Sequence, residues 1–145
     1  MIDNFKRTEK IARLICNKSV EYSKDYRLLQ TPQTIQVSSH WTEAVHEVAH
    51  WIACDPQYRN LDNLGLPKYH DDTNQRMFRE EVVAQVITKL LSDKYFDGVT
   101  RQEKSYIEYI NQNSIDTCNR FKWDRKKVLK KSYKLFSQYD RLLID

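Results

Sequence analysis

The chain has 145 residues, of which 40% are hydrophobic and 30% are charged, and its net charge is +4. This length fits a single domain over 1–145 and allows a core without disulfides. The negative mean hydropathy and the lack of any run of about 18 apolar residues exclude a membrane-spanning protein. Only two glycines and three prolines punctuate the chain, which predicts a mainly α fold of long helices.

The first third of the chain predicts a helix, a strand and a second helix. Apolar residues recur at helical spacing over 5–22, which predicts an amphipathic helix. Residues 34–37, Thr-Ile-Gln-Val, alternate as in a strand, so we expect a hairpin or edge strand and at most a short two-stranded β element. Ser38 and Ser39 are candidate N-caps for a helix over 40–54.

The remainder predicts a long loop and three more helices, about five in all. Residues 57–72 lack a clear period and contain Gly, Pro, Asn and Asp, which indicates a surface loop. The first of these helices is expected from Asp72, paired with Gln75, to about Phe96. The second begins at Thr100, which forms a capping box with Glu103. The third runs from Asp124 to Leu143, with Leu129, Tyr133 and Phe136 on its packing face.

The N-terminus and the cysteines both bear on the cellular compartment. Residues 1–10 lack the apolar core of a secretory signal. Cys16, Cys54 and Cys118 are odd in number and too widely spaced for a disulfide framework or a paired metal site. We therefore expect a cytoplasmic protein with buried, reduced thiols.

The second predicted helix contains a metal-binding pattern. His46-Glu47-Val48-Ala49-His50 matches His-Glu-x-x-His, and two histidines four residues apart project from one face of a helix. A single zinc ion can then bind both imidazoles, and a catalytic site needs a third protein ligand from elsewhere in the chain. The alternative is that both histidines lie on a helix face without a metal.

Glu47 lies between the two candidate ligands. A catalytic zinc ion lowers the pKa of its water to about 7. Glu47 is then the expected general base, taking the proton of the water and passing it to the leaving group. The pattern therefore predicts hydrolysis by a metal-activated water.

The third ligand is expected at the start of the otherwise apolar third helix, where Glu80 and Glu81 are adjacent. A carboxylate there is explained if it binds metal; otherwise both lie exposed in the electropositive first turn. We favour Glu81, because Ala84 and Gln85 then stand at i+3 and i+4, leaving room and a hydrogen-bond partner beside the site. Glu80 remains the alternative.

Other residues near the motif are weaker candidates. Cys54 continues the spacing of His50 but would lie about 12 Å from the first ligand, too far for the same ion. His70 can be a third ligand or a carbonyl polariser, although a surface histidine is the simpler interpretation. Tyr69, Tyr106 and Tyr109 can each donate to an oxyanion, and the sequence does not distinguish them.

The motif and its surroundings resemble the zincin-like metallopeptidase domain of ArdC-type antirestriction proteins from plasmids and phages. The resemblance covers residues 38–96 and rests on the motif helix, the loop with Asp55, Pro56 and Arg59, and the glutamate helix over 78–84. It implies an α+β zincin-like fold of gluzincin type, with ligands His46, His50 and Glu81 and with Glu47 as base. The chain departs from the family at Gln85, where an acidic residue is usual, and 37 residues are too few for the DNA-binding domain that usually comes first.

The C-terminal segment is basic. Residues 120–145 hold nine Lys or Arg against three Asp, a net charge of +6, whereas residues 1–119 have a net charge of −2. We expect Lys126, Lys127, Lys130, Lys131 and Lys134 to lie opposite the packing face of the last helix. Such a face can bind nucleic acid without sequence preference, or an acidic partner. The alternative is an ordinary solvated face.

These observations predict a zinc-dependent metallopeptidase that acts on a protein or peptide, of phage or plasmid type, with an antirestriction or host-interaction role. A nucleic-acid-associated binding module with a structural zinc is the alternative. A helical interaction protein without metal is the third possibility.

Overall fold

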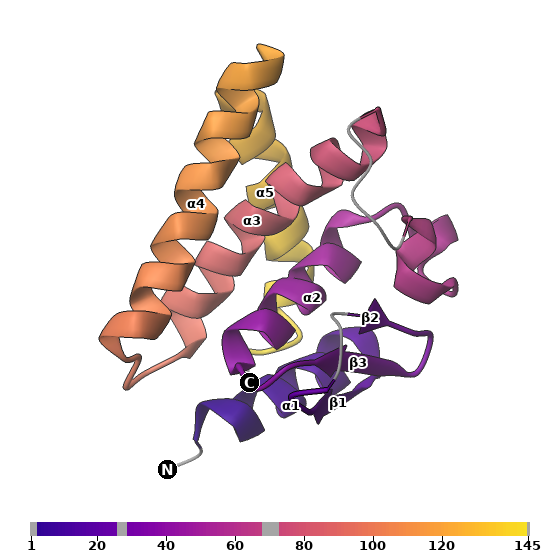
Figure 1. Cartoon of the computed structure of the whole chain (residues 1–145), viewed down its shortest axis with the longest axis vertical. Helices are drawn as coiled ribbons and strands as arrows, with labels where there is room; N and C mark the ends of the chain where they lie inside the picture. The colour runs from indigo at the N-terminus through magenta and orange to yellow at the C-terminus, as the bar shows by residue number, and fades with distance from the viewer. Residues whose placement is uncertain (1–2, 26–28, 68–72, 145) are drawn as a thin grey trace.

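The computed structural model describes residues 3–25, 29–67 and 73–144 (Figure 1). In chain order the elements are α1 (Asn4–Cys16), β1 (Ser19–Tyr22), β2 (Leu29–Gln30), β3 (Thr34–Val37), α2 (Trp41–Ala53), the short 3-10 helices η1 (Pro56–Tyr58) and η2 (Asp62–Gly65), α3 (Gln75–Tyr95), α4 (Arg101–Phe121) and α5 (Arg125–Asp140). Among the described residues, five α-helices accompany a small sheet. The mainly α prediction is confirmed.

The sheet has three strands in the order β1-β3-β2, one strand more than expected. β1 pairs in parallel with β3, and β2 pairs antiparallel with it. Ile35 and Val37 are fully buried while Thr34 and Gln36 are only half-buried, so the predicted alternation over 34–37 is confirmed.

The first helix is shorter than predicted, because residues 19–22 form β1 instead of continuing it. Asn17 adopts the left-handed conformation with φ 55°. Its N–H donates to the carbonyl of Arg13, and the N–H of Lys18 donates to that of Ala12. The bond from Asn17 to Arg13 is that of the αL motif that ends helices, and the left-handed residue turns the chain into the sheet.

α2 lies at the centre of the molecule, between α1 with the sheet on one side and α3 on the other (Figure 1). Its apolar face is almost completely buried. The core includes Ile11, Ile15, Ile35, Val37, Trp41, Val45, Val48, Ile52, Val83, Ile87 and Leu91. The packing of this face fixes the rotation of α2 and therefore the direction of its polar face.

The ends of α2 are held differently from what the sequence suggested. The N-cap is His40 and makes no side-chain cap hydrogen bond, so the expectation of a Ser38 or Ser39 cap is wrong. Ser38 instead donates its N–H to the carboxylate of Glu43, 3.2 Å away, and its hydroxyl bonds the same oxygen. At the other end, Arg59 donates to the carbonyl of Trp51 at 3.0 Å.

The later helices begin close to their expected positions. The N-cap of α3 is Asn74, whose side chain accepts from the N–H of Met77; Asp72, which we expected there, lies outside the described residues. Thr100 and Glu103 form the predicted capping box of α4. Asp124 caps α5.

α5 packs on the core through a stripe that differs from the predicted one. Tyr133 is 50% exposed, so its assignment to the packing face is wrong. Phe136 packs against the core as predicted, together with Val128, Leu135 and Tyr139, and Ser132 is buried. Along the chain, Val128 and Ser132 are four residues apart, and Leu135, Phe136 and Tyr139 follow Ser132 by three, four and seven residues. Tyr133 lies about 100° away from Ser132 around the helix.

The cysteines are free and buried, as expected. In the stretches of chain that the structure describes, we find no helix with both the length and the apolar character needed to cross a membrane.

Candidate metal centre

His46 and His50 lie one turn apart on α2, as the motif predicts. Their ring centroids are 4.6 Å apart and the ring planes are inclined at 76°. Each side chain is only 12% exposed. Because the opposite face of α2 packs in the core, both imidazoles are directed toward α3.

Glu81 of α3 meets both imidazoles. One of its carboxylate oxygens lies 2.8 Å from Nε2 of His46, and the other lies 3.0 Å from Nε2 of His50. The candidate ligand atoms of these three residues all lie within 4.8 Å of one another. The structure therefore brings together the three residues that the sequence suggested.

Thr88 fixes the ring orientation of His46. The Thr88 hydroxyl donates to the carbonyl of Ala84 at 2.7 Å, and it lies 2.8 Å from Nδ1 of His46. Since its only proton is used, the hydroxyl accepts a hydrogen bond from Nδ1–H. The Nε2 lone pair of His46 is then left for a ligand on the Glu81 side.

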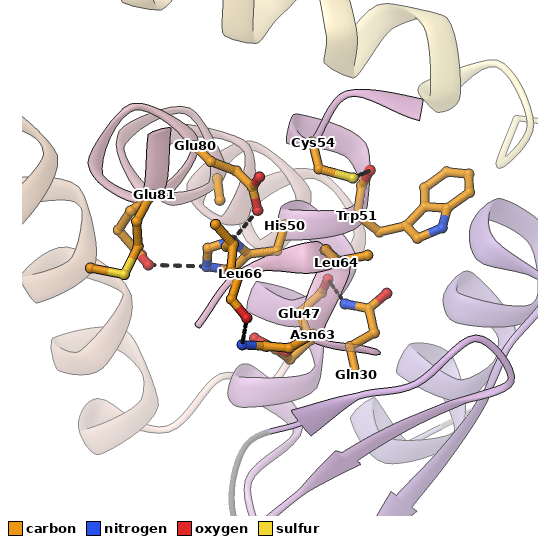
Figure 2. Close-up of polar contacts among 12 residues, drawn as sticks. Gln30, Glu47, His50, Trp51, Cys54, Asn63, Leu64, Leu66, Glu80 and Glu81 are labelled. Atoms are coloured by element: carbon orange, nitrogen blue, oxygen red, sulfur yellow. Dashed lines mark hydrogen bonds and ion pairs between the residues drawn. The ribbon is translucent and has the colours of Figure 1, made fainter. Parts of the chain in front are cut away.

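Glu80 does the same for His50. Its carboxylate is 4% exposed and accepts from Nδ1 of His50 at 3.1 Å (Figure 2). The second oxygen pairs with Arg76 at 3.4 Å. Glu80 therefore contacts Nδ1 of His50, whereas Glu81 contacts Nε2 of both histidines. The two adjacent glutamates thus bind opposite nitrogens of the His50 ring.

The charges of the cluster are strongly coupled. Burial disfavours the protonated form of His50, but the Glu81 carboxylate and the hydrogen bonds to Glu80 and Glu81 outweigh it and raise the pKa of His50 well above its ordinary value. Burial also opposes ionisation of Glu81, but His50 and His46 hold the pKa of that carboxyl well below its ordinary value. The two shifts favour a proton on Nε2 of His50, which donates to the Glu81 carboxylate.

The donor set fits a zinc ion. Two ligand atoms at about 2.0–2.1 Å from zinc in tetrahedral geometry are roughly 3.3 Å apart. The observed separations between Glu81 and the two Nε2 atoms are 2.8 and 3.0 Å. Each separation involves a different oxygen of Glu81 and lies within a few tenths of an ångström of the ideal value. At 35% exposure the carboxylate has room to adjust to an ion.

Glu47 lies beside the cluster but outside the three-residue group. The residue is 8% exposed, and its carboxylate contributes to the negative potential that raises the pKa of both His50 and Tyr106. Its backbone carbonyl accepts a hydrogen bond from Gln30 at 2.8 Å (Figure 2). Gln30 in turn accepts from the buried ammonium of Lys18 at 2.7 Å. Lys18 and Gln30 thus anchor the backbone of the motif at Glu47.

Tyr106 of α4 is coupled electrostatically to the cluster. Burial raises the pKa of its hydroxyl, and the carboxylates of Glu43, Glu81 and Glu47 raise it further. It lines a cavity of about 330 Å³ at the start of α2 and α4, together with His40, Thr42, Glu43, Thr100, Gln102 and Glu103. By contrast, Tyr109 is 68% exposed.

The remaining sequence candidates do not join the cluster. The Sγ of Cys54 donates to the carbonyl of Trp51, in agreement with its rejection as a ligand. His70 and Tyr69 lie outside the described residues. Gln85 does not act as the hydrogen-bond partner that we expected beside the site, because its side-chain oxygen is buried without a partner.

The sequence interpretation missed Thr88 and Arg76. Thr88 stands two turns after Glu81 on the same face of α3, so its spacing could have identified it. Arg76 connects Glu80 to the loop before α3, since it donates to the carbonyls of Leu64 at 2.7 Å and Gly65 at 3.2 Å. The contact of Arg76 with Leu64 and Gly65 could not be predicted from neighbouring residues, because it depends on how the loop before α3 packs against that helix.

Comparison of the chain with protein-family models, with curated proteins and with solved structures finds no match. What the site can do must therefore be inferred from its own geometry.

Proposed function

We propose that the protein is a zinc-dependent metallopeptidase in which His46, His50 and Glu81 bind the ion and Glu47 is the general base. The observation that carries the proposal is the orientation of the two histidines. Nδ1 of His46 donates to Thr88 and Nδ1 of His50 donates to Glu80. The Nε2 atoms of both histidines face the carboxylate of Glu81. Second partners of this kind are typical of imidazoles that bind metal.

Zinc suits this donor set better than calcium or magnesium do. Calcium and magnesium favour oxygen ligands, whereas zinc is commonly held by imidazole nitrogens and one carboxylate. Three protein ligands leave a fourth tetrahedral position free, which distinguishes catalytic from structural zinc sites. The motif order over residues 38–96, which resembles ArdC-type domains, also favours this metal.

In the proposed hydrolysis, the bound metal, Glu47 and Tyr106 have different roles. Bound zinc would supply a polarised water and a Lewis acid for the substrate carbonyl. Glu47 would accept the proton and return it to the leaving amine. Tyr106 is the candidate donor to the developing oxyanion, since its hydroxyl is protonated at neutral pH and is coupled electrostatically to Glu81 and Glu47.

The biological setting is part of the proposal. Free thiols at Cys16, Cys54 and Cys118 favour a reducing compartment, so we propose a cytoplasmic protein. The resemblance to ArdC-type domains supports a phage or plasmid protein that acts on a host or self protein, with an antirestriction or host-interaction role.

Metal content and cleavage must be measured together. We expect one zinc ion per chain by elemental analysis, and cleavage of a peptide library that mass spectrometry detects. Glu47→Gln should keep the zinc and lose cleavage by roughly a hundredfold or more, because only the base is removed. Glu81→Ala should lose the zinc, whereas Glu80→Gln, which still accepts from His50, should keep it with weaker affinity.

Two results would contradict the proposal. Full cleavage by Glu47→Gln would remove the assigned base. Stoichiometric zinc in a chain that cleaves none of the library would favour the alternative, a binding module in which the zinc is structural.

A further inference from the structure

A groove on the far side of α3 is independent of the metal centre. It has a volume of about 420 Å³ and lies between α3, the turn that follows α4, and the first two turns of α5. Its apolar wall is formed by Val82, Val83, Val128 and Trp123. Arg79, Lys122, Asp124, Lys127 and Lys131 complete the lining.

The groove is strongly basic. Four cationic side chains line it against one carboxylate, and all four are exposed. Asp124 is engaged as the N-cap of α5, where it accepts from the N–H of Lys126 at 3.0 Å. Among the residues that the structure describes, no carboxylate forms an ion pair with any of these four cations. The groove therefore holds uncompensated positive charge.

Trp123, which lines the groove, belongs to a cluster of aromatic rings. Trp123 stacks on Phe121 with centroids 4.8 Å apart, and Phe121 contacts Phe78 at 5.1 Å. The guanidinium of Arg79 lies 4.6 Å from the centre of the Trp123 ring. Arg120 lies over Phe121 at 4.9 Å. A cluster of half-buried rings with two exposed guanidinium groups thus adjoins the groove at Trp123.

We propose that this groove binds single-stranded nucleic acid, with phosphates on Lys127, Lys131 and Lys122 and a base against the apolar wall beside Trp123. Proteins that bind single strands combine a cationic track with aromatic and guanidinium surfaces on which bases stack. An acidic peptide would satisfy the cations but would leave the flat apolar wall uncovered. The charge and the wall together therefore favour a nucleic acid.

α5 provides its own control. Lys127 and Lys131 are one turn apart and line the groove, whereas Lys126 and Lys130 are also one turn apart but lie about 100° away around the helix and do not line it. All four are exposed. Reversing either pair changes the net charge equally, so a difference between them reports the groove and not the overall charge.

The test is a binding titration of the full chain. A fluorescein-labelled oligothymidylate of about ten nucleotides serves as probe, and anisotropy is measured from about 50 to 200 mM salt. We expect Lys127→Glu/Lys131→Glu to weaken binding at least tenfold and to reduce the salt slope by about 1.4. Lys126→Glu/Lys130→Glu should weaken binding by less than about threefold.

Two further ligands test the stacking part without any variant. An abasic strand with the same number of phosphates should bind about tenfold more weakly, because one stacked base contributes about that factor. Polyglutamate of equal charge should fail to displace the oligothymidylate. Equal effects of the two lysine pairs, equal binding of the abasic strand, or displacement by polyglutamate would each overturn the proposal.

The inference does not depend on the peptidase proposal. Glu47→Gln should bind the oligothymidylate as the wild type does, since Glu47 does not line the groove. Circular dichroism of each lysine variant shows whether the chain remains folded, and the abasic comparison on the wild type decides the result if one variant does not.

Discussion

The hydroxyl of Thr88 determines which nitrogen of His46 faces Glu81. Thr88 is fully buried, and its proton is directed to the carbonyl of Ala84, so it can only accept from His46. A single methyl-for-hydroxyl exchange would remove that acceptor and leave the Nδ1–H of a 12%-exposed imidazole without a partner.

Thr88→Val is therefore expected to weaken zinc binding by about 10- to 100-fold, the usual effect of removing a partner of a metal-binding histidine. Competition with a chromogenic chelator measures the affinity. Thr88→Ser keeps the hydroxyl and should bind zinc almost as the wild type does. Equal affinity of the valine and serine variants would exclude this positioning role.

The buried pair of Lys18 and Gln30 is the second residue-scale feature. Both are at most 1% exposed, and Gln30 joins the Lys18 ammonium to the backbone of Glu47. Gln30→Leu should lower the free energy of unfolding by about 1–3 kcal/mol, because it leaves a buried ammonium unsatisfied. In urea unfolding, Lys18→Met/Gln30→Leu should cost less than Gln30→Leu alone. A larger cost for the double variant would contradict this account.

The charge of Lys18 also gives a pH dependence. Burial lowers the pKa of Lys18, and the neighbouring Cys16, Cys54 and Glu47 only partly offset this. Protonated Lys18 therefore opposes folding below its lowered pKa, and the penalty disappears as the pH rises toward the ordinary lysine value. Relative to Lys18→Met, the wild type should gain stability with rising pH over that interval, as urea midpoints can show.

At the scale of elements, the connection between α2 and α3 is held by unusual backbone. Asn63, Leu64 and Gly65 all have φ between 52° and 73°. Arg76 bonds two carbonyls of this segment and lies 3.8 Å from the ring centre of Tyr58. Only Gly65 avoids a Cβ in this conformation, while Leu64 is kept there by burial at 2% exposure.

Gly65 and Gly98 form a matched pair for testing this strain. Both have positive φ, but a Cβ on Gly65 would lie 3.1 Å from Tyr58 and 3.2 Å from Leu61, whereas one on Gly98 meets nothing within 4 Å. Gly98→Ala should cost about 1 kcal/mol from backbone strain alone. Gly65→Ala should cost clearly more, and equal thermal unfolding temperatures of the two variants would show that the contacts have no effect.

What the sequence could predict depends on how local each feature is. The spacing of His46 and His50 and the capping box of α4 are contained in a few consecutive residues, and both were found. β1 was missed because its partner β3 lies 15 residues later, and the left-handed Asn17 that starts it has no distinctive pattern. The separate contacts of Glu80 and Glu81 depend on how α3 crosses α2, which no local pattern encodes.

At the scale of the molecule, a bound ion would join α2 to α3. An ion that binds only the folded chain raises stability, by about 3 kcal/mol at a hundredfold excess over its Kd. For a chain of this size we expect the unfolding temperature to rise by roughly 5–10 °C with zinc and to fall again with a chelator. His46→Gln/His50→Gln should show no rise, and a similar rise in that variant would place the zinc elsewhere.

The separation of Glu81 from the two histidines has a consequence for biosynthesis. Residue 81 follows His46 by 35 positions and His50 by 31. At a translation rate of about 5–20 residues per second, the ribosome adds the second histidine roughly 1.5–6 s before it adds the carboxylate. During that interval the nascent chain can offer zinc only the two imidazoles, which bind it weakly. The full affinity for zinc requires α3 to pack against α2.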